Sequence, residues 1–489
     1  MTMLGVVKTD GRGGRLSRWL TFALAAAALP VAACSLDVTD PDIITPDNLQ
    51  GASALPTIRA AAIGDFALSY SGSGADGSQG TEGITMMSGL LGDEWVNSET
   101  FPTRIEIDRR STQVTNGTLS GWFRTISRAR RSAEFAADRF RALSDTLSNT
   151  GYTEMLSLSG FTYLWFAENW CSGVPISTAS PDGSLVFGQP LTTQNLIDSA
   201  VTRFRHARNV ADSMSLSAAA KATVLNLARV GLGRALLDSG AFANAAVAVA
   251  SVPSTFTYNI QHSLTTNREN NGVFVAVNRS KRYSVAEREG INGLPYRSAT
   301  DPRLPFVRGA GIDSVGFDGT SPQWNQLRFQ DQKAFIPLAT GVEARLIEAE
   351  AALHAPADTT DNAGVFYGKV NGLRTNPIQG SYYWQPPLSV PPPLAALTTD
   401  SATAYGGAVR LLFRERAFWM WLSAHRLGDM RRLARQYAAY GDSVSNVFPI
   451  GPYQPTTTKG GVYGTDVNFP VPFEETNNPN FTQCLDRNP

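Results

Sequence analysis

Apolar side chains recur at helical spacing along much of this 489-residue chain, and this pattern limits the fold to a mainly α-helical class. The clearest example is residues 116–143, where arginines occupy the face opposite the apolar stripe. The stripe consists of Leu119, Trp122, Phe123, Ile126, Ala129, Ala133, Ala136 and Phe140. The pattern predicts a long amphipathic helix with one face buried in a core.

Helical character returns in several later segments. These are residues 153–170, 192–213, 220–240, 241–253, 338–355 and 404–438. The 153–170 segment is apolar nearly all round, which is typical of a buried helix. Small alanines at helical spacing on 220–240 and 241–253, with a break at Gly240, predict two antiparallel helices that pack closely, as in a tetratricopeptide hairpin.

Two regions lack this periodicity. Residues 254–337 have the pattern of short strands and long loops, and residues 356–403 contain the proline-rich "WQPPLSVPPPL", which must be irregular. We therefore expect helical pairs over about 52–253 and 338–440, and loop-rich insertions over about 254–337 and 356–403.

Residues 1–33 have the composition of a secretory signal peptide. Basic residues up to Arg18 precede an apolar run that Pro30 interrupts and that is too short to span a bilayer. The "VAAC" that ends at Cys34 resembles a bacterial lipobox, in which the cysteine thiol receives a diacylglycerol before cleavage. An ordinary signal peptide with an incidental cysteine is the alternative. We expect a lipoprotein anchored through Cys34 that lies outside the cytoplasm.

The segment that follows the lipobox cysteine predicts a tether. Residues 34–51 contain Pro41, Pro46 and several aspartates, which favours an extended chain between lipid and fold. The folded domain is then expected to comprise residues 52–489.

Charge and motif content exclude several classes of function. The 42 Lys and Arg are balanced by 42 Asp and Glu, so no nucleic-acid partner is expected. None of the four histidines has the spacing of a zinc protease, and no Walker loop occurs, so neither a metal nor a cofactor is predicted. The "GSGADG" at 72–77 has the spacing of a dinucleotide loop, but no helix opening follows it, and a surface loop is the better interpretation.

Asp93 and Glu94 are the candidates for glycosidase chemistry, which needs two carboxyl groups across a sugar bond. Neighbours in sequence rarely face one another in that way, so a polar loop is the favoured interpretation. No catalytic residue is predicted, and the chain is not expected to be an enzyme.

The chain has three cysteines, and lipidation of Cys34 would leave Cys171 and Cys484 as the two that can form a disulfide. Disulfides persist outside the cytoplasm, so a bridge between the C-terminus and the turn after the 153–170 helix is favoured. Two free thiols or metal binding are the alternatives.

The segment "LFRERAFWMWLSAHRLGDMRRLAR", residues 412–435, resembles the C-terminal signature of the SusD/RagB family. Four other segments resemble family motifs in the right order along the chain: "GDEWVNS" (92–98), "ENWCSGVPIS" (168–177), "ATDPRL" (299–304) and "NFPVPFEETNNPN" (468–480). Cys171 is a departure, because many members carry another residue there. The signature positions are Arg414, Glu415, Arg416, His425, Arg426, Gly428 and Asp429, for which packing and ion pairing are the expected roles.

This resemblance implies a superhelix of tetratricopeptide-like helix pairs with an irregular, loop-rich half that contains short strands. It also implies a lipoprotein at the outer membrane, facing the cell exterior, that binds oligosaccharides or peptides and delivers them to a SusC-type TonB-dependent transporter. A lipid-anchored hydrolase of the same nutrients and a helical-repeat scaffold of the envelope are the alternatives.

Carbohydrate binding uses flat aromatic faces, because sugars present apolar C–H patches rimmed by hydroxyl groups. Aromatic residues with polar or loop neighbours are therefore the predicted ligand contacts, namely Tyr70, Trp95, Tyr296, Trp324, Tyr382, Tyr383 and Trp384. A partly buried core or loop position is the alternative for each of them. Trp122, Trp165 and Trp421 fall on helical stripes and are predicted core residues.

Overall fold

The computed structural model describes residues 49–74, 82–180, 184–354, 362–376, 392–437, 444–454, 457 and 459–489. Cys34 and the predicted contacts Tyr382, Tyr383 and Trp384 lie outside these ranges. The chain divides into two units after Ala54. In the first unit the described residues contain one short turn of helix, Ala52–Ala54. The second unit, Leu55–Pro489, contains every element discussed below.

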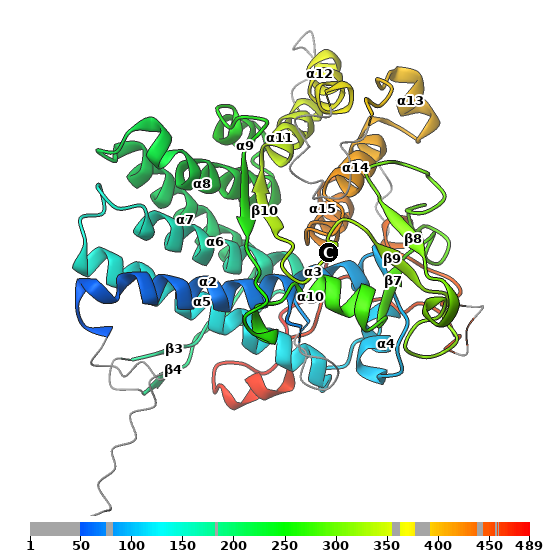
Figure 1. Ribbon diagram of the computed structural model, residues 1–489, viewed down its shortest axis with the longest axis horizontal. Helices are drawn as coiled ribbons and strands as arrows, with labels where there is room; N and C mark the ends of the chain where they lie inside the picture. Colours follow the sequence, from blue (N-terminus) through cyan, green and yellow to red (C-terminus); the bar gives the residue numbers. More distant parts are fainter. Residues whose placement is uncertain are drawn as a thin grey trace, which may run out of the picture. The chain divides into compact units, whose positions relative to one another are not determined.

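Helices of the second unit stack side by side in nearly the order of the chain (Figure 1). They are α2 (Leu55–Ser71), α5 (Gly117–Leu143), α6 (Gly151–Asn169), α7 (Thr193–Ser213), α8 (Ala218–Asp238), α9 (Phe242–Val249), α11 (Gly341–Leu353) and α12 (Asn362–Thr375). Helix α2 packs on α5, each of α5 to α9 packs on the next, and α11 packs on both α9 and α12. Successive packing of antiparallel neighbours is the tetratricopeptide-like arrangement, so the predicted fold class is confirmed.

Side-chain caps explain where α5 and α7 begin. The Asn116 side chain accepts the Leu119 N–H at 3.1 Å at the start of α5. Thr192 forms a reciprocal capping box with Asn195 at the start of α7. The caps supply partners for amide groups that the first turn of a helix leaves unpaired.

The residues of the predicted stripe on α5 are all buried, because that face packs against α2 and α6.

Glycines allow close packing at the centre of the stack. The buried Phe204 ring of α7 lies between Gly160 of α6 and Gly231 of α8. A Cβ atom would lie 2.9 Å from this ring if placed on Gly160 and 2.2 Å from it on Gly231. Both distances are shorter than van der Waals contact, so these two positions require glycine for the ring to fit.

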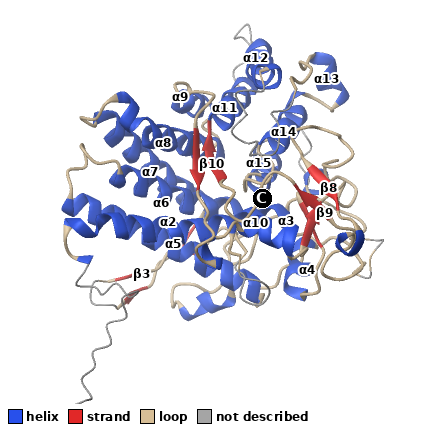
Figure 2. Cartoon of the chain, in the orientation of Figure 1, coloured by secondary structure: helices blue, strands red, loops and turns tan. Residues whose placement is uncertain are grey.

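Short antiparallel pairs of strands connect the helices and occur in both halves of the second unit (Figure 2). The pairs are β1 (Trp95–Asn97) with β7 (Tyr283–Val285), β2 (Val174–Pro175) with β5 (Pro190–Leu191), β3 (Thr178–Ala179) with β4 (Leu185–Val186), β6 (Thr257–Ile260) with β10 (Ile336–Thr340), and β8 (Phe306–Arg308) with β9 (Trp324–Gln326). Short helices accompany them: α3 (Ile84–Leu91), α4 (Pro102–Asp108), α10 (Gly272–Phe274) and α16 (Val444–Val447).

The single helix predicted over 404–438 is wrong. The structure has α13 (Thr399–Ala404), α14 (Ala408–Trp419) and α15 (Arg426–Gln436) instead. Between α14 and α15 the chain turns, with φ of 60° at Leu422 and 61° at Ala424. A tertiary hydrogen bond holds this turn, because Glu94 Oε1 accepts the Leu422 N–H at 3.0 Å, and the Tyr70 hydroxyl oxygen lies 3.3 Å from the Ser423 carbonyl oxygen. These long-range contacts outweigh the local helix propensity of the sequence.

The insertion predicted over 356–403 also differs in part from expectation, because α12 forms within it. Phe366 and Val370 of α12 are fully buried and belong to an apolar cluster with Ala349 of α11 and Leu411 of α14. This burial stabilises a helix in a segment that was expected to be loop-rich. The prediction of irregular structure for the proline-rich residues 384–394 falls mostly outside the described residues.

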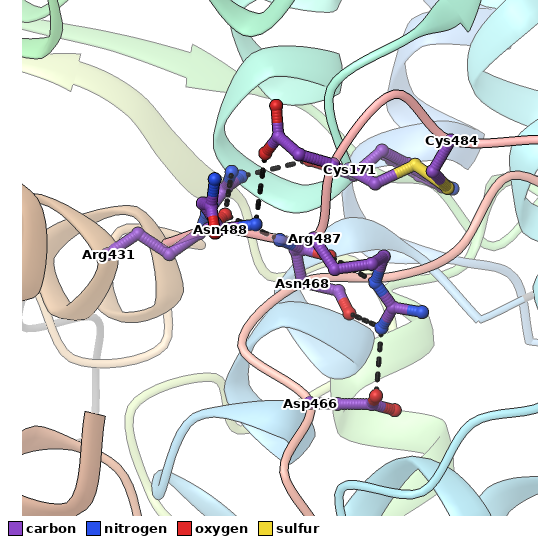
Figure 3. The surroundings of a disulfide bond; sticks show 9 residues. Cys171, Arg431, Asp466, Asn468, Cys484, Arg487 and Asn488 are labelled. Carbon is purple, nitrogen blue, oxygen red and sulfur yellow. Dashed lines mark hydrogen bonds and ion pairs between the residues drawn. A yellow bond between two sulfur atoms is a disulfide. The ribbon is translucent and has the colours of Figure 1, made fainter. Parts of the chain in front are cut away.

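A disulfide joins Cys171 to Cys484, with a Cα–Cα distance of 5.9 Å (Figure 3). The bridge lies beside a set of bonds that hold the C-terminal residues. The Asn468 amide donates to the Asn488 carbonyl at 2.8 Å, and Arg487 Nη2 lies 2.8 Å from Asp466 Oδ1. The last residues of the chain are therefore held to the turn that follows α6.

Candidate ligand-binding cleft

The sequence segments that resemble family motifs meet in the interior through buried ion pairs. Arg426 binds Asp93 with two hydrogen bonds of 2.6 and 2.9 Å. Arg303, from the 299–304 segment, binds Glu415 with bonds of 2.5 and 3.1 Å. All four residues are buried. Segments that are far apart in the chain are thus held together by charge-assisted bonds.

His425 and Asp429 are also buried and paired with charged side chains of the protein interior. His425 is buried, with Nε2 3.1 Å from Glu343 Oε1 and 3.0 Å from Arg234 Nη1. Its pKa is lowered from the ordinary value, first by burial and then by the Arg234 charge. Burial alone would raise the pKa of Asp429, but guanidinium groups, chiefly that of Arg416, hold it well below its usual range.

The remaining signature positions also serve packing. Arg416 binds Asp429 with two bonds of 2.8 and 2.9 Å, and Arg414 lies over the Phe418 ring at 4.3 Å. At Gly428 a Cβ atom would approach the Glu168 side chain to 3.2 Å, so glycine permits the close approach of α15 to α6.

Three of the predicted ligand contacts are corrected by their burial. Tyr70 donates to the Pro337 carbonyl at 2.7 Å and is 1% exposed, and Trp95 is 0% exposed. Tyr296, also 0% exposed, donates to Asp93 Oδ1 at 3.1 Å. A ring enclosed on all sides presents no face to a ligand, so none of the three forms an open platform.

The two acids at 93 and 94 are likewise buried. Asp93 is fully engaged by Arg426, Tyr296 and the Leu294 N–H. Burial raises the pKa of Glu94 to about 8, so this carboxyl group is largely protonated at neutral pH. Neither group is exposed enough to flank a sugar bond, which agrees with the interpretation of both as structural.

Trp324 is the one predicted contact among the described residues that borders an open cleft. The cleft has a volume of about 630 Å³ and is formed by β7, β9 and neighbouring loops. Its lining consists of Val96, Ser284, Val285, Glu287, Arg288, Glu289, Gly290, Arg297, Arg308, Ser321, Pro322, Trp324, Pro452, Gln454 and Thr457. This size is in the range of small-ligand sites.

Side-chain hydrogen bonds fix two walls of the cleft. The Ser284 hydroxyl of β7 accepts the Trp324 N–H at 2.8 Å and donates to the Pro322 carbonyl at 3.1 Å, which joins β7 to β9. On the other side, Asp108 Oδ2 accepts the Tyr453 hydroxyl at 2.8 Å and the Gln454 amide at 2.9 Å. The cleft therefore has a preformed frame.

Charged groups surround the Trp324 ring. The guanidinium carbon of Arg297 lies 4.4 Å from the ring centroid, that of Arg308 lies at 5.3 Å, and the Phe306 ring is 5.7 Å away, edge to face. The indole thus combines an apolar surface with cationic neighbours, as cation–π contacts require. Arg288, on the same cleft, has a φ of 49°, which side chains other than glycine rarely adopt.

No family model matches the sequence, and no curated protein matches it by sequence. Solved structures do match. A SusD superfamily protein from Parabacteroides distasonis is 13% identical with a TM-score of 0.61, and 91% of this chain covers 100% of that one. A SusD/RagB family protein from Bacteroides thetaiotaomicron is 13% identical with a TM-score of 0.59, covering 87% of this chain and 94% of that one.

This chain has the SusD/RagB fold. A third match is a structure from Bacteroides fragilis that is described as a SusD-like carbohydrate-binding protein, at 15% identity and a TM-score of 0.57. The match covers 87% of this chain and 98% of the Bacteroides fragilis chain. The likeness thus extends over both the helical stack and the loop-rich half of the SusD/RagB fold.

Sequence reasoning missed most of the cleft of this SusD/RagB fold. Glu287, Arg288, Arg297 and Gln454 come from irregular segments, and Arg308 ends the three-residue strand β8, so no periodic pattern marks their exposure. The one feature of the sequence that pointed to these residues is the mixture of charges around "YRSATDPRL". Charged loops are common on protein surfaces, so this feature alone does not identify a binding site.

Within the described part of the chain, no cluster of His, Cys, Asp and Glu side chains has the arrangement of a metal site. No described helix is long and apolar enough to cross a membrane.

Proposed function

We propose that this chain binds oligosaccharides in the cleft beside Trp324. The observation that carries the proposal is the position of a partly exposed tryptophan in a preformed cleft of a SusD/RagB fold. A structural neighbour with the same fold is described as carbohydrate-binding. An indole offers the apolar surface on which sugar C–H groups pack, and peptide ligands are the second class to test.

The proposal includes delivery of the ligand to a TonB-dependent outer-membrane transporter of the SusC type. Two features of the sequence support it: the lipobox-like "VAAC" ending at Cys34, and the tether over residues 34–51. Acylation of Cys34 would anchor the protein at the outer membrane beside such a transporter, facing the cell exterior. Co-purification of a β-barrel transporter with the lipidated protein from native membranes is the expected result, and a complex that lacks one would favour the scaffold alternative.

Binding is tested with purified mature protein on arrays of oligosaccharides and peptides, followed by calorimetry on the hits. Trp324→Ala is expected to weaken binding by about 2 kcal/mol, or roughly thirtyfold, since truncated aromatic anchors lose energy of this order. Phe135→Ala, at an exposed position on α5, is the matched control and should bind as the parent does. Equal affinity of the Trp324 variant and the parent would contradict this location of the site.

The hydrolase alternative concerns Glu287 and Glu289, which both line the cleft. Both are engaged in loop structure, since Glu287 Oε2 accepts the Arg297 and Ser298 N–H groups at 2.7 and 2.8 Å, and Glu289 Oε2 accepts the Tyr463 hydroxyl at 2.5 Å. We therefore expect no new reducing ends when bound oligosaccharides are incubated with the protein. Turnover that Glu289→Gln abolishes would replace the binding function with a catalytic one.

A further inference from the structure

Three arginines line the cleft, and within the described residues none of them has the two-bond carboxylate partner that Arg303, Arg416 and Arg426 have in the core. Arg288 Nε lies 3.4 Å from Glu287 Oε1, and its side chain is 65% exposed. Among the described residues, Arg308 donates to the carbonyl groups of Ser314 and Gln323, the latter at 2.8 Å. Within the described residues, neither Arg297 nor Arg308 has a carboxylate within ion-pair distance.

Arg297 is the least compensated of the three. Its Nε is buried and has no hydrogen-bond partner among the described residues. Its guanidinium group packs on the Trp324 ring, which fixes the plane of the group without neutralising the charge. Burial lowers the pKa of Arg297, which marks a cation that has lost water and has not gained a full counter-ion.

The acids of the cleft compensate that charge only in part, because burial lowers the pKa of Arg297 by more than Glu287 and Glu289 raise it. Both oxygens of Glu287 accept hydrogen bonds from the 297–298 turn, including the Ser298 hydroxyl. Burial, together with the nearby Asp108 carboxylate, raises the pKa of Glu289 to about 8, so it is mostly neutral at pH 7. The cleft therefore carries a net positive charge from its lining residues.

We propose that this cleft selects oligosaccharides that carry carboxylate groups, as in uronic acids, and that Arg297 binds the carboxylate with Arg288 and Arg308 beside it. The inference rests on the proposed function and adds the class of ligand. A guanidinium group held in one plane suits a carboxylate, which can accept two parallel hydrogen bonds from it.

Calorimetry with tetragalacturonic acid and with its methyl ester tests this directly, because the two probes share one sugar chain and the ester replaces each carboxylate charge with a neutral methyl ester. The parent should bind the acid at least about tenfold more tightly, as expected for one charge-assisted hydrogen bond. Arg297→Gln should remove most of this preference while its affinity for the ester changes by less than about twofold, and Arg297→Lys should keep part of it. Arg205→Gln, at an exposed position on α7, removes the same charge away from the cleft and should leave both affinities unchanged.

Equal binding of the two probes by the parent would overturn the carboxylate preference while the oligosaccharide function stands. An equal loss of both probes in Arg297→Gln would assign Arg297 a packing role and also overturn it. Binding of acidic peptides and of no oligosaccharide would overturn the proposed function itself. Circular dichroism of each variant confirms that the affinities are compared between folded proteins.

Discussion

Replacement of Gly231 by alanine tests the packing at the centre of the helix stack. The new Cβ would lie 2.2 Å from a carbon of the Phe204 ring, about 1.5 Å closer than van der Waals contact allows. The ring cannot retreat, because Gly160 lies behind it and Phe161 packs against it at 4.9 Å. Overpacking of this kind costs about 1–3 kcal/mol and severe cases cost more, whereas alanine gains about 1 kcal/mol over glycine in helix propensity. The expected net loss is about 2 kcal/mol, from the upper part of that range.

Urea unfolding followed by circular dichroism measures the difference in the free energy of unfolding. Gly121→Ala is the matched control, because Gly121 lies inside α5 and a Cβ there meets nothing within 4 Å. This control should be stabilised by about 1 kcal/mol through helix propensity alone. The two substitutions are chemically identical, so the gap of about 3 kcal/mol between them isolates the clash.

A double variant gives the outcome that would refute this account. Phe204→Leu alone leaves a cavity, and the methyl group of Gly231→Ala should partly occupy it when the two are combined. The cost of the pair should therefore fall below the sum of the single costs by about 1 kcal/mol or more. Additive costs, or a Gly231→Ala protein as stable as the parent, would show that Phe204 does not fill the space between α6 and α8.

Three other properties can be measured on the same protein. The non-reduced, exported protein should show no reactive thiol at Cys171 or Cys484, and replacing both with serine should lower the free energy of unfolding by about 2–5 kcal/mol. Because burial raises the pKa of Glu94 to about 8, its contribution to the free energy of unfolding is complete below pH 4.5 and is lost as the pH rises toward 8. Urea unfolding at several pH values should therefore show that the free energy of unfolding falls less steeply with pH in Glu94→Gln than in the parent. The difference in slope should be up to about 1.4 kcal/mol per pH unit. Asn116→Ala should cost about 1 kcal/mol in a thermal melt, because the α5 cap is lost, and no change would argue against the capping bond.

The helical half of the fold could be predicted because each helix carries its own signal. The stripe at 116–143 and the apolar segment at 153–170 coincide with α5 and α6 to within two residues. The prediction failed at 404–438, where the turn before α15 depends on Glu94 and Tyr70. Such long-range partners leave no trace in the local pattern, so propensity extended the helix through the turn.

The candidate site could be predicted only in part, because the sequence does not show which aromatic residues are enclosed. Trp95 and Trp324 both lie in polar segments and both begin short strands. Trp95 is covered by α3, where the Cβ position of Gly89 lies 2.7 Å from its ring, whereas Trp324 lies on a strand that borders the cleft. Their different exposure comes from tertiary packing alone, and composition around each tryptophan does not encode it.

Arginine pairing separates residues that hold the fold from those assigned to the ligand, and stability measurements can check the division. Arg426 has a bidentate carboxylate partner in Asp93, so Arg426→Gln leaves a buried charge unpaired and should cost about 3–5 kcal/mol. Arg297 has no such partner, so Arg297→Gln removes a desolvated charge and should leave the free energy of unfolding unchanged or raise it. An anion bound in the cleft would pair with this charge. Comparable destabilisation by the two substitutions, measured by urea unfolding, would mean that Arg297 belongs to the structural set and would remove the basis for assigning it to a ligand.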